Sequence, residues 1–176
     1  MRKAYVSIGA LTDGMIAGIV GETDYYVVSY EPSKSRYAKH KAMVCDRVEA
    51  HKKAVWSGDG TITLHNTPSP TVCDSTLKVG SEVVDAVGIN AVLGRFDEIA
   101  VLNLNCEGAE IAILDNADPA LLVKCEKILV EFHVFRTDLE CSQEDVDRCV
   151  TRLSKDYECK MLKEKYPIWE FTRKES

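Results

Sequence analysis

The sequence lacks the signals that mark several common protein classes. No apolar run reaches the roughly 18 residues that a membrane-spanning helix needs, and no apolar stretch follows the basic start Arg2-Lys3 as it would in a signal peptide. The seven cysteines form no Cys-x-x-Cys pair and show no zinc-type spacing with histidine, and their number is odd. These absences predict a cytoplasmic protein with reduced thiols, no membrane partner and no metal site.

Positive charge is also scarce. The 22 lysine and arginine residues are outnumbered by 28 aspartate and glutamate residues, which gives a formal net charge of −6. Proteins whose main ligand is a phosphate backbone usually carry a basic face, so this balance argues against nucleic acid as a partner. Apolar residues make up 45% of the 176 residues, which is enough for one hydrophobic core. We therefore expect a single domain over residues 1–176.

Apolar runs typical of strands alternate with helical patterns along the chain. The predicted strands are 5–8, 25–30, a weak one at 48–56, 61–65, 99–104, 128–133, 157–163 and 168–173. The predicted helices are 15–20, 33–44, one capped by Ser81 and running through Val87, 107–114, 120–124 and one that starts at Ser142. Residues 66–76 are expected to form a surface loop. This order predicts an α/β fold with a mostly parallel sheet, helices on both faces and a C-terminal antiparallel hairpin.

Several polar or glycine-rich segments follow the predicted strands, where α/β sheets bind ligands. The turn from Gly9 to Gly14 can bring backbone N–H groups and a helix N-terminus close to a ligand, although an ordinary strand–helix turn would have the same composition. Glu31 ends the second strand about 20 residues later, the usual distance between a glycine turn and the acid that holds a ribose. The alternative for Glu31 is a solvated residue at a strand end.

The richest segment of this kind follows the most apolar strand. Asn105, Glu107 and Glu110 lie there within six residues, and His133 closes the next strand at the same edge of the sheet. Carboxylates and imidazole are the groups that most often move protons in catalysis. Helix capping by Asn105 and a favourable dipole for the two acids would explain the same residues without any chemistry.

Residues in this order and spacing resemble the FkbM family of methyltransferases. The segment Asn-Leu-Asn-Cys-Glu-Gly-Ala-Glu, followed by Leu-Val-Glu-Phe-His, is similar to that family's Leu-Lys-Ile-Asp-x-Glu-Gly-Ala-Glu and later Glu-x-His. Ser-Ile-Gly-Ala and Ser-Tyr-Glu-Pro resemble its opening Asp-x-Gly-Ala turn and second-strand Glu-Pro. Lys-Ala-Val-Trp resembles the segment before its hairpin. The likeness runs from about Tyr5 to His133, and the Glu-Gly-Ala-Glu element is its most specific part.

The resemblance implies a Rossmann-like class I methyltransferase fold with a seven-stranded sheet, and S-adenosylmethionine as the cofactor. It also implies methyl transfer to a hydroxyl group of a small molecule or glycan. The methionine part of the cofactor would lie at the glycine turn, the ribose at the second strand end and the adenine near Ala54 and Val55. The cofactor-binding positions implied in this way are Ser7, Gly9, Ala10, Gly14, Glu31, Ala54 and Val55. The implied positions facing the acceptor are His133, Glu107, Asn105 and Glu110.

The chain departs from the family pattern at three polar positions. Ser7 stands where the family has Asp, and Asn103 and Asn105 stand where it has Lys and Asp. Since charge-assisted hydrogen bonds are the stronger kind, two lost acids would weaken cofactor binding tenfold or more, at about 1 kcal/mol or more per acid. We expect His133 to be the general base, with Glu107 as the second candidate, and Asn105 to orient the acceptor.

Two other functions remain open from the sequence. The lost acids, and a start directly at the first strand without a segment to cover the cofactor, favour a degenerate fold that binds a ligand or a protein without catalysis. A partner subunit in a homo-oligomer could also supply the missing cover. A nucleotide-dependent oxidoreductase is the third alternative, against which the absent G-x-G-x-x-G fingerprint argues.

Overall fold

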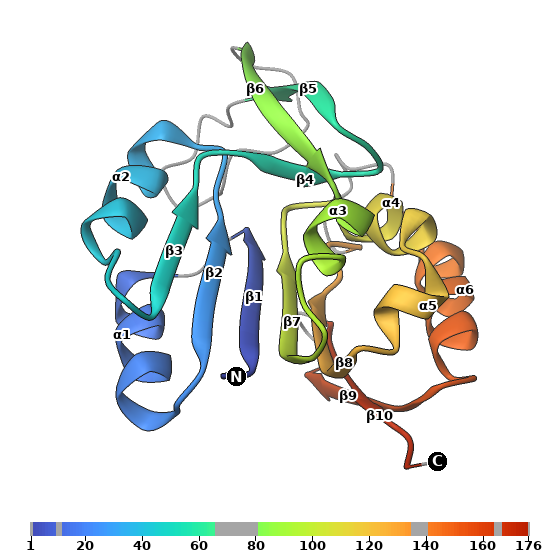
Figure 1. Cartoon of the computed structure of the whole chain (residues 1–176). Helices are drawn as coiled ribbons and strands as arrows, with labels where there is room; N and C mark the ends of the chain where they lie inside the picture. The colour runs from blue at the N-terminus through green and yellow to red at the C-terminus, as the bar shows by residue number, and fades with distance from the viewer. Residues whose placement is uncertain (1, 10–11, 66–80, 135–140, 164–166, 176) are drawn as a thin grey trace.

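Parallel strands form the centre of the molecule. The computed structural model describes residues 2–9, 12–65, 81–134, 141–163 and 167–175, and within them a seven-stranded sheet lies between two layers of helices (Figure 1). The strands of this sheet, in their order across it, are β3 (Val48–His51), β2 (Tyr26–Tyr30), β1 (Ala4–Gly9), β7 (Ile99–Asn105), β8 (Cys125–Glu131), β10 (Ile168–Arg173) and β9 (Tyr157–Lys163).

The strand order reverses direction at the centre of the sheet. β1 pairs in parallel with both β2 and β7, so the chain first builds outward to β3 and then returns to build the other half. β10 runs antiparallel to both β8 and β9 and completes the C-terminal hairpin. These findings confirm the predicted α/β fold with a mostly parallel sheet and are compatible with a Rossmann-like arrangement. The switch point of this strand order is the carboxyl end of β1 and β7, the place where open α/β sheets commonly bind ligands.

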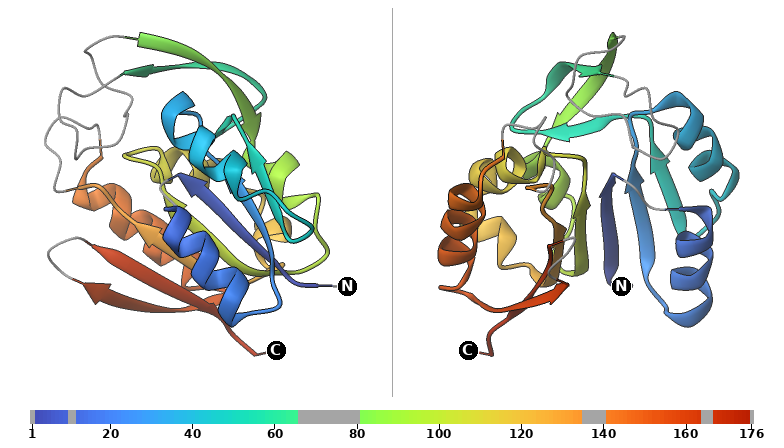
Figure 2. Two further views of the ribbon diagram at one scale, coloured as in Figure 1. Left: turned by 90° about the vertical axis from the view of Figure 1, so that its left-hand side faces the viewer. Right: turned by 180° about the vertical axis from the view of Figure 1, so that it is seen from behind.

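Helices cover both faces of the sheet, as the alternating pattern predicts. Figures 1 and 2 show α1 and α2 on one face and α3 to α6 on the other. Their bounds are α1 (Asp13–Glu22), α2 (Lys34–Ala42), α3 (Ile89–Leu93), α4 (Glu110–Asn116), α5 (Pro119–Leu122) and α6 (Gln143–Leu153). None of the helices in the described part of the chain is both long and apolar enough to cross a membrane.

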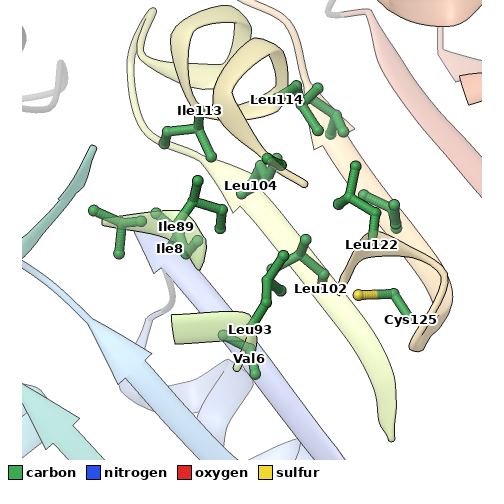
Figure 3. Close-up of a cluster of buried hydrophobic side chains, with 14 of the residues drawn as sticks. Val6, Ile8, Ile89, Leu93, Leu102, Leu104, Ile113, Leu114, Leu122 and Cys125 are labelled. Atoms are coloured by element: carbon green, nitrogen blue, oxygen red, sulfur yellow. The ribbon is translucent and has the colours of Figure 1, made fainter. Parts of the chain in front are cut away.

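The main hydrophobic core lies between the central strands and the α3–α6 layer (Figure 3). Alternate residues of β1 and β7 point into it, because successive side chains of a strand face opposite sides. Apolar residues from both layers fill it, namely Val6, Ile8, Ile89, Leu93, Leu102, Leu104, Ile113, Leu114 and Leu122. Residues such as these each contribute roughly 1.5–3 kcal/mol on burial, so this cluster is the main source of stability.

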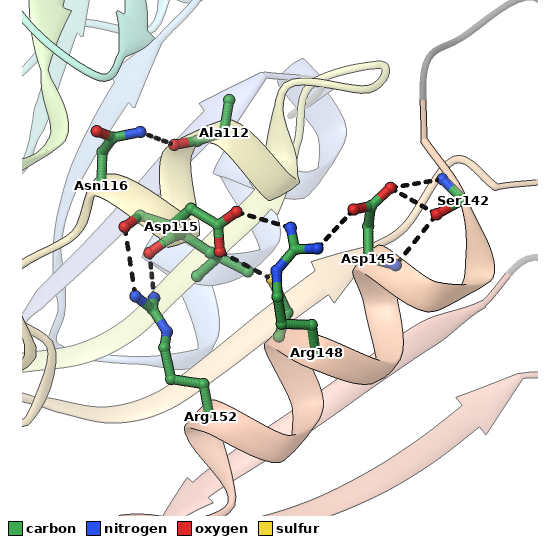
Figure 4. Close-up of polar contacts among 9 residues, drawn as sticks. Ala112, Asp115, Asn116, Ser142, Asp145, Arg148 and Arg152 are labelled. Carbon is green, nitrogen blue, oxygen red and sulfur yellow. Dashed lines mark hydrogen bonds and ion pairs between the residues drawn. The ribbon is translucent and has the colours of Figure 1, made fainter.

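The polar side of α6 fixes this helix against α4 (Figure 4). Ser142 and Asp145 form a capping box at its N-terminus, and Val146, Cys149 and Leu153 are buried on its inner face, at the spacing that the sequence shows. Arg148 donates to Asp145 at 2.7 Å and to Asp115 of α4 at 2.9 Å. The helix α6 is therefore held in place both by apolar packing and by the ion pairs of Arg148.

A second sheet, which the sequence analysis did not predict, lies across the carboxyl end of the first (Figure 1). It contains β4 (Ala54–Trp56), β6 (Ser81–Gly88) and β5 (Gly60–His65). The helix predicted from Ser81 through Val87 is wrong, because this segment is β6. Its side chains alternate, with Val84 only 6% exposed and Val83 66% exposed, and β-branched valines favour strands. The weak strand predicted over 48–56 proves to be two strands, one in each sheet.

Other boundaries also differ from the predicted ones. The helix predicted over 107–114 begins only at Glu110, because Glu107 and Gly108 have positive φ values that no α-helix tolerates. β8 begins at Cys125 and ends before His133, which therefore lies in the following loop. The loop predicted at 66–76 lies outside the described residues.

Candidate functional site

The turns that follow β1 and β7 lie directly against each other at the switch point. Gly9 ends β1 with a φ of 90°, and a Cβ atom added there would lie 1.9 Å from the carbonyl oxygen of Asn105. Any side chain at position 9 would therefore push the end of β7 away. Gly9 is required by this backbone contact, which is a packing role in addition to any role toward a ligand.

The turn after β7 carries unusual backbone strain. Glu107 has a φ of 55°, and it is the one non-glycine residue with a positive φ in the described part of the chain. Gly108 follows with a φ of 101°. Left-handed conformations cost a side-chain-bearing residue roughly 1 kcal/mol or more, and they concentrate at functional sites. The loop therefore holds the Glu107 side chain in a position that ordinary backbone geometry does not reach.

The Glu110 carboxylate holds this strained loop in place from inside. It accepts hydrogen bonds from the backbone N–H of Cys106 at 2.7 Å and of Gly108 at 2.9 Å, one through each oxygen. The residue is 0% exposed, so both bonds are made in a low-dielectric interior, where they are stronger than in water. Glu110 thus acts on the shape of the loop, and it does so at the first residue of α4.

His133 joins Glu110 to Glu107. Its Nδ1 lies 3.0 Å from Oε1 of Glu110, and its Nε2 lies 3.5 Å from Oε2 of Glu107. The carboxylate of Glu110 accepts, so Nδ1 carries the donated hydrogen and Nε2 faces Glu107. Burial pulls the pKa of His133 down, but its hydrogen bond with Glu110 and the nearby carboxylates of Glu107 and Glu131 hold that pKa above its ordinary value. The imidazole is therefore held between two carboxylates, at both of its nitrogens.

Asn105 has a partner that the sequence analysis missed. Its amide nitrogen donates to Oε2 of Glu131 at 2.7 Å, across the ends of β7 and β8. Glu131 lies two residues before His133 in the Glu-x-His segment, and this spacing was the one sequence signal that could have revealed it. An acidic residue at position 105 would put two carboxylates in contact, so Asn105 suits this neighbour.

Ser7 and Asn103 form a neutral pair below the edge. They stand opposite each other in the register of β1 and β7, and the Asn103 amide donates to the Ser7 hydroxyl at 3.3 Å. Ser7 is fully buried. This predicted cofactor position therefore contacts its neighbouring strand and lies beneath the surface of the site.

Glu31 lies at the carboxyl end of β2, on the other side of the switch point. It is 4% exposed, and its Oε1 accepts from the backbone N–H of Ser33 at 2.8 Å, just before α2 begins. A buried carboxylate at this edge offers acceptor oxygens to hydroxyl groups. Its position at the edge of the sheet is the one that the sequence pattern requires.

The remaining predicted cofactor positions contribute mainly packing. The Ala54 side chain is buried in the core of the smaller sheet, and Val55 belongs to the main core. Gly14 lies in the first turn of α1, where a Cβ atom would meet no atom closer than 3.9 Å, so its glycine character is not required. Ala10 lies outside the described residues.

The chemistry available at this edge is that of carboxylates and one imidazole. Burial raises the pKa of the Cys106 thiol well above its ordinary value, and Glu110 raises it further, so this thiol is a poor nucleophile. Among the described residues, no group of three or more histidines, cysteines or acids is placed to hold a metal ion. Neither a scan against protein-family models nor a search of curated proteins finds a match for the chain.

Proposed function

We propose that this protein is a methyltransferase that uses S-adenosylmethionine and transfers its methyl group to a hydroxyl of a small molecule or glycan. The observation that carries the proposal is the buried line Glu107–His133–Glu110 at the carboxyl edge, beside the switch point of the sheet. Two further features support it. The closing hairpin fits the seven-stranded sheet of class I methyltransferases, and the buried Glu31 directly follows β2, where a ribose-binding acid is expected.

The residues at this edge fit the chemistry of the proposed cofactor. S-adenosylmethionine, when bound, supplies an electrophilic methyl group on a positively charged sulfonium. Glu31 offers carboxylate oxygens for ribose hydroxyls, and it is fixed by the N–H of Ser33. Glu107 and Glu131 add negative charge at the same edge, which favours a cationic ligand.

Ser7 and Asn103 depart from the FkbM pattern together, as a hydrogen-bonded neutral pair. In that pattern an Asp and a Lys would occupy these two positions, which face each other across β1 and β7. Both members of a charged pair are thus replaced together by a hydrogen-bonded neutral pair. The change at position 7 therefore removes no isolated carboxylate from the cofactor, and the expected loss of affinity is smaller than the sequence alone suggests.

In this proposal Glu107 takes the proton of the acceptor hydroxyl. It is the most exposed member of the line at 9%, against 3% for His133 and 0% for Glu110. Both nitrogens of His133 face carboxylates, so His133 is a positioning residue that orients Glu107. This assignment reverses the order expected from the sequence, in which His133 was the first candidate for the base and Glu107 the second.

A binding protein without catalysis is the second candidate. One observation favours it, namely that an amide N–H of Asn105 is already donated to Glu131, which leaves this side chain fewer donors to orient an acceptor. In this case the edge would bind a nucleoside-like ligand, and the line of Glu107, His133 and Glu110 would serve only to stabilise the loop.

Methyl transfer from tritium-labelled S-adenosylmethionine to a panel of sugars and other hydroxylated compounds separates the two candidates. The proposal predicts transfer by the wild-type protein and a fall of about 100-fold or more in Glu107→Gln, since a general base typically contributes that factor. Glu144→Gln, a change on the exposed first turn of α6, is the matched control and should leave the rate unchanged. Cofactor binding without transfer to any acceptor would favour the binding protein.

A further inference from the structure

The strand β9 forms one edge of the larger sheet. β9 is the last strand in the sheet order, and no strand of the described residues pairs with its outer side. It is 7 residues long, whereas β3 at the opposite edge has 4. A long open edge presents a row of backbone N–H and C=O groups to another chain, and proteins usually cover or shorten such edges.

The side chains of β9 divide clearly between its two faces. Cys159 stands opposite Phe171 and packs against the main core, whereas Glu158 and Lys160 stand opposite Thr172 and Glu170 on the other face. Toward the end of the strand, Met161 and Leu162 are 42% and 45% exposed. The edge therefore combines open backbone, two charges of opposite sign and uncovered apolar surface.

We propose that two copies of this chain join through β9, as antiparallel neighbours related by a two-fold axis centred on Cys159. A two-fold axis perpendicular to the sheet keeps each side chain on its own face, so only registers centred on a residue are compatible with it. This register places Glu158 of each copy opposite Lys160 of the second copy. The same contact thus occurs twice, with opposite charges facing each other across the new strand pair.

Neighbouring registers are less favourable on the same argument. A centre on Lys160 places the two Lys160 side chains opposite each other, and like charges directly opposite destabilise a strand pair. A centre on Met161 places Lys160 opposite Leu162, so it forms no contact between Glu158 and Lys160. In the register centred on Cys159, Met161 of each copy lies opposite Tyr157 of the other, which covers apolar surface that is exposed in the single chain. The larger sheet then continues without interruption from one copy into the next, and this inference does not depend on the proposed catalytic activity.

Charge exchange at positions 158 and 160 tests the interface in sedimentation-equilibrium runs on the full chain. The wild-type protein is expected to dimerise, and Glu158→Lys, which creates two lysine pairs, should weaken the dimer about tenfold or more. The double change Glu158→Lys with Lys160→Glu restores both opposite-charge contacts and should restore the dimer. Lys160→Glu alone places glutamates opposite each other and should weaken it as Glu158→Lys does.

Both positions are exposed, so these changes should leave the fold intact, which circular dichroism of each variant checks. Glu144→Lys on α6 is the control for a charge reversal away from β9, and it should leave the dimer unchanged. A wild-type protein that is monomeric at all concentrations overturns the proposal. So does a dimer that Glu158→Lys leaves intact, or one that the double change does not restore.

Discussion

The turns after β1 and β7 meet at the switch point, and both require a positive φ, but they meet this requirement with different residues. After β1 the residue is Gly9, with a φ of 90°. After β7 it is Glu107, with a φ of 55°, followed by Gly108. Glycine removes the strain where the position only has to let two backbones approach. A glutamate in the same kind of conformation keeps its side chain despite the backbone strain, which is the pattern expected at a functional site.

The first turn is the more sensitive of the two to a small side chain. Gly9→Ala places a Cβ atom 1.9 Å from the Asn105 carbonyl and also imposes a left-handed conformation on alanine. We expect a loss of about 3–5 kcal/mol in the free energy of unfolding, measured by urea denaturation. Gly14→Ala is the control in the neighbouring helix α1, and it should be neutral or stabilise by up to about 1 kcal/mol. Equal effects of the two changes would show that the close contact is not rigid.

The second turn depends on the carboxylate that fixes it. Glu110→Gln replaces one acceptor oxygen by an NH₂ group that faces backbone N–H donors, so we expect a loss of about 2–4 kcal/mol. The same change removes a carboxylate that raises the pKa of His133, so this pKa should fall in an NMR titration of the imidazole. Glu144→Gln on the surface of α6 should change stability by less than about 0.5 kcal/mol. An unshifted His133 pKa would contradict the contact between these residues.

The strain at Glu107 can be measured by comparing two substitutions. Glu107→Ala keeps a Cβ atom in the left-handed conformation, whereas Glu107→Gly removes both this atom and the strain. Both variants lose the carboxylate that faces His133, so their difference reports mainly the backbone conformation. We expect Glu107→Gly to be more stable than Glu107→Ala by about 1 kcal/mol in the same denaturation experiment. A more stable Glu107→Ala would mean that the turn carries no strain.

Most of the larger sheet could be predicted from the sequence, because its strands and helices carry strong local signals. The buried β1 and the largely buried β7 are mostly apolar runs, and α6 shows both a capping box and an apolar face at helical spacing. The smaller sheet could be predicted only in part, since the alternation over 61–65 indicates β5 but no local signal assigns this strand to a second sheet. Its strand β6 has the valine spacing of a short helix, and only pairing with β4 and β5 makes it a strand. Such long-range pairing leaves no mark in a short window of sequence.

The candidate site could likewise be predicted only in part from the sequence. The ends of the predicted strands indicate which polar residues share an edge of the sheet. They place four residues at the same edge, namely Asn105, Glu107, Glu110 and His133. They could not predict what each residue contacts, since this depends on the positive φ of Glu107 and on the inward turn of the Glu110 side chain. The pairing of Asn105 with Glu131 depends on the alignment of two strands distant in sequence. The roles proposed for His133 and Glu107 rest on these contacts, which a short window of sequence does not show.

Calorimetric titration with S-adenosylmethionine and S-adenosylhomocysteine tests the central proposal most directly. Both compounds are expected to bind saturably. Glu31→Gln should weaken that binding about tenfold or more, because it loses a charged acceptor while keeping an oxygen for the Ser33 N–H. Glu22→Gln at the exposed end of α1 should bind as the wild-type protein does. No heat with either compound, together with no change in melting temperature at millimolar concentration, would contradict the account.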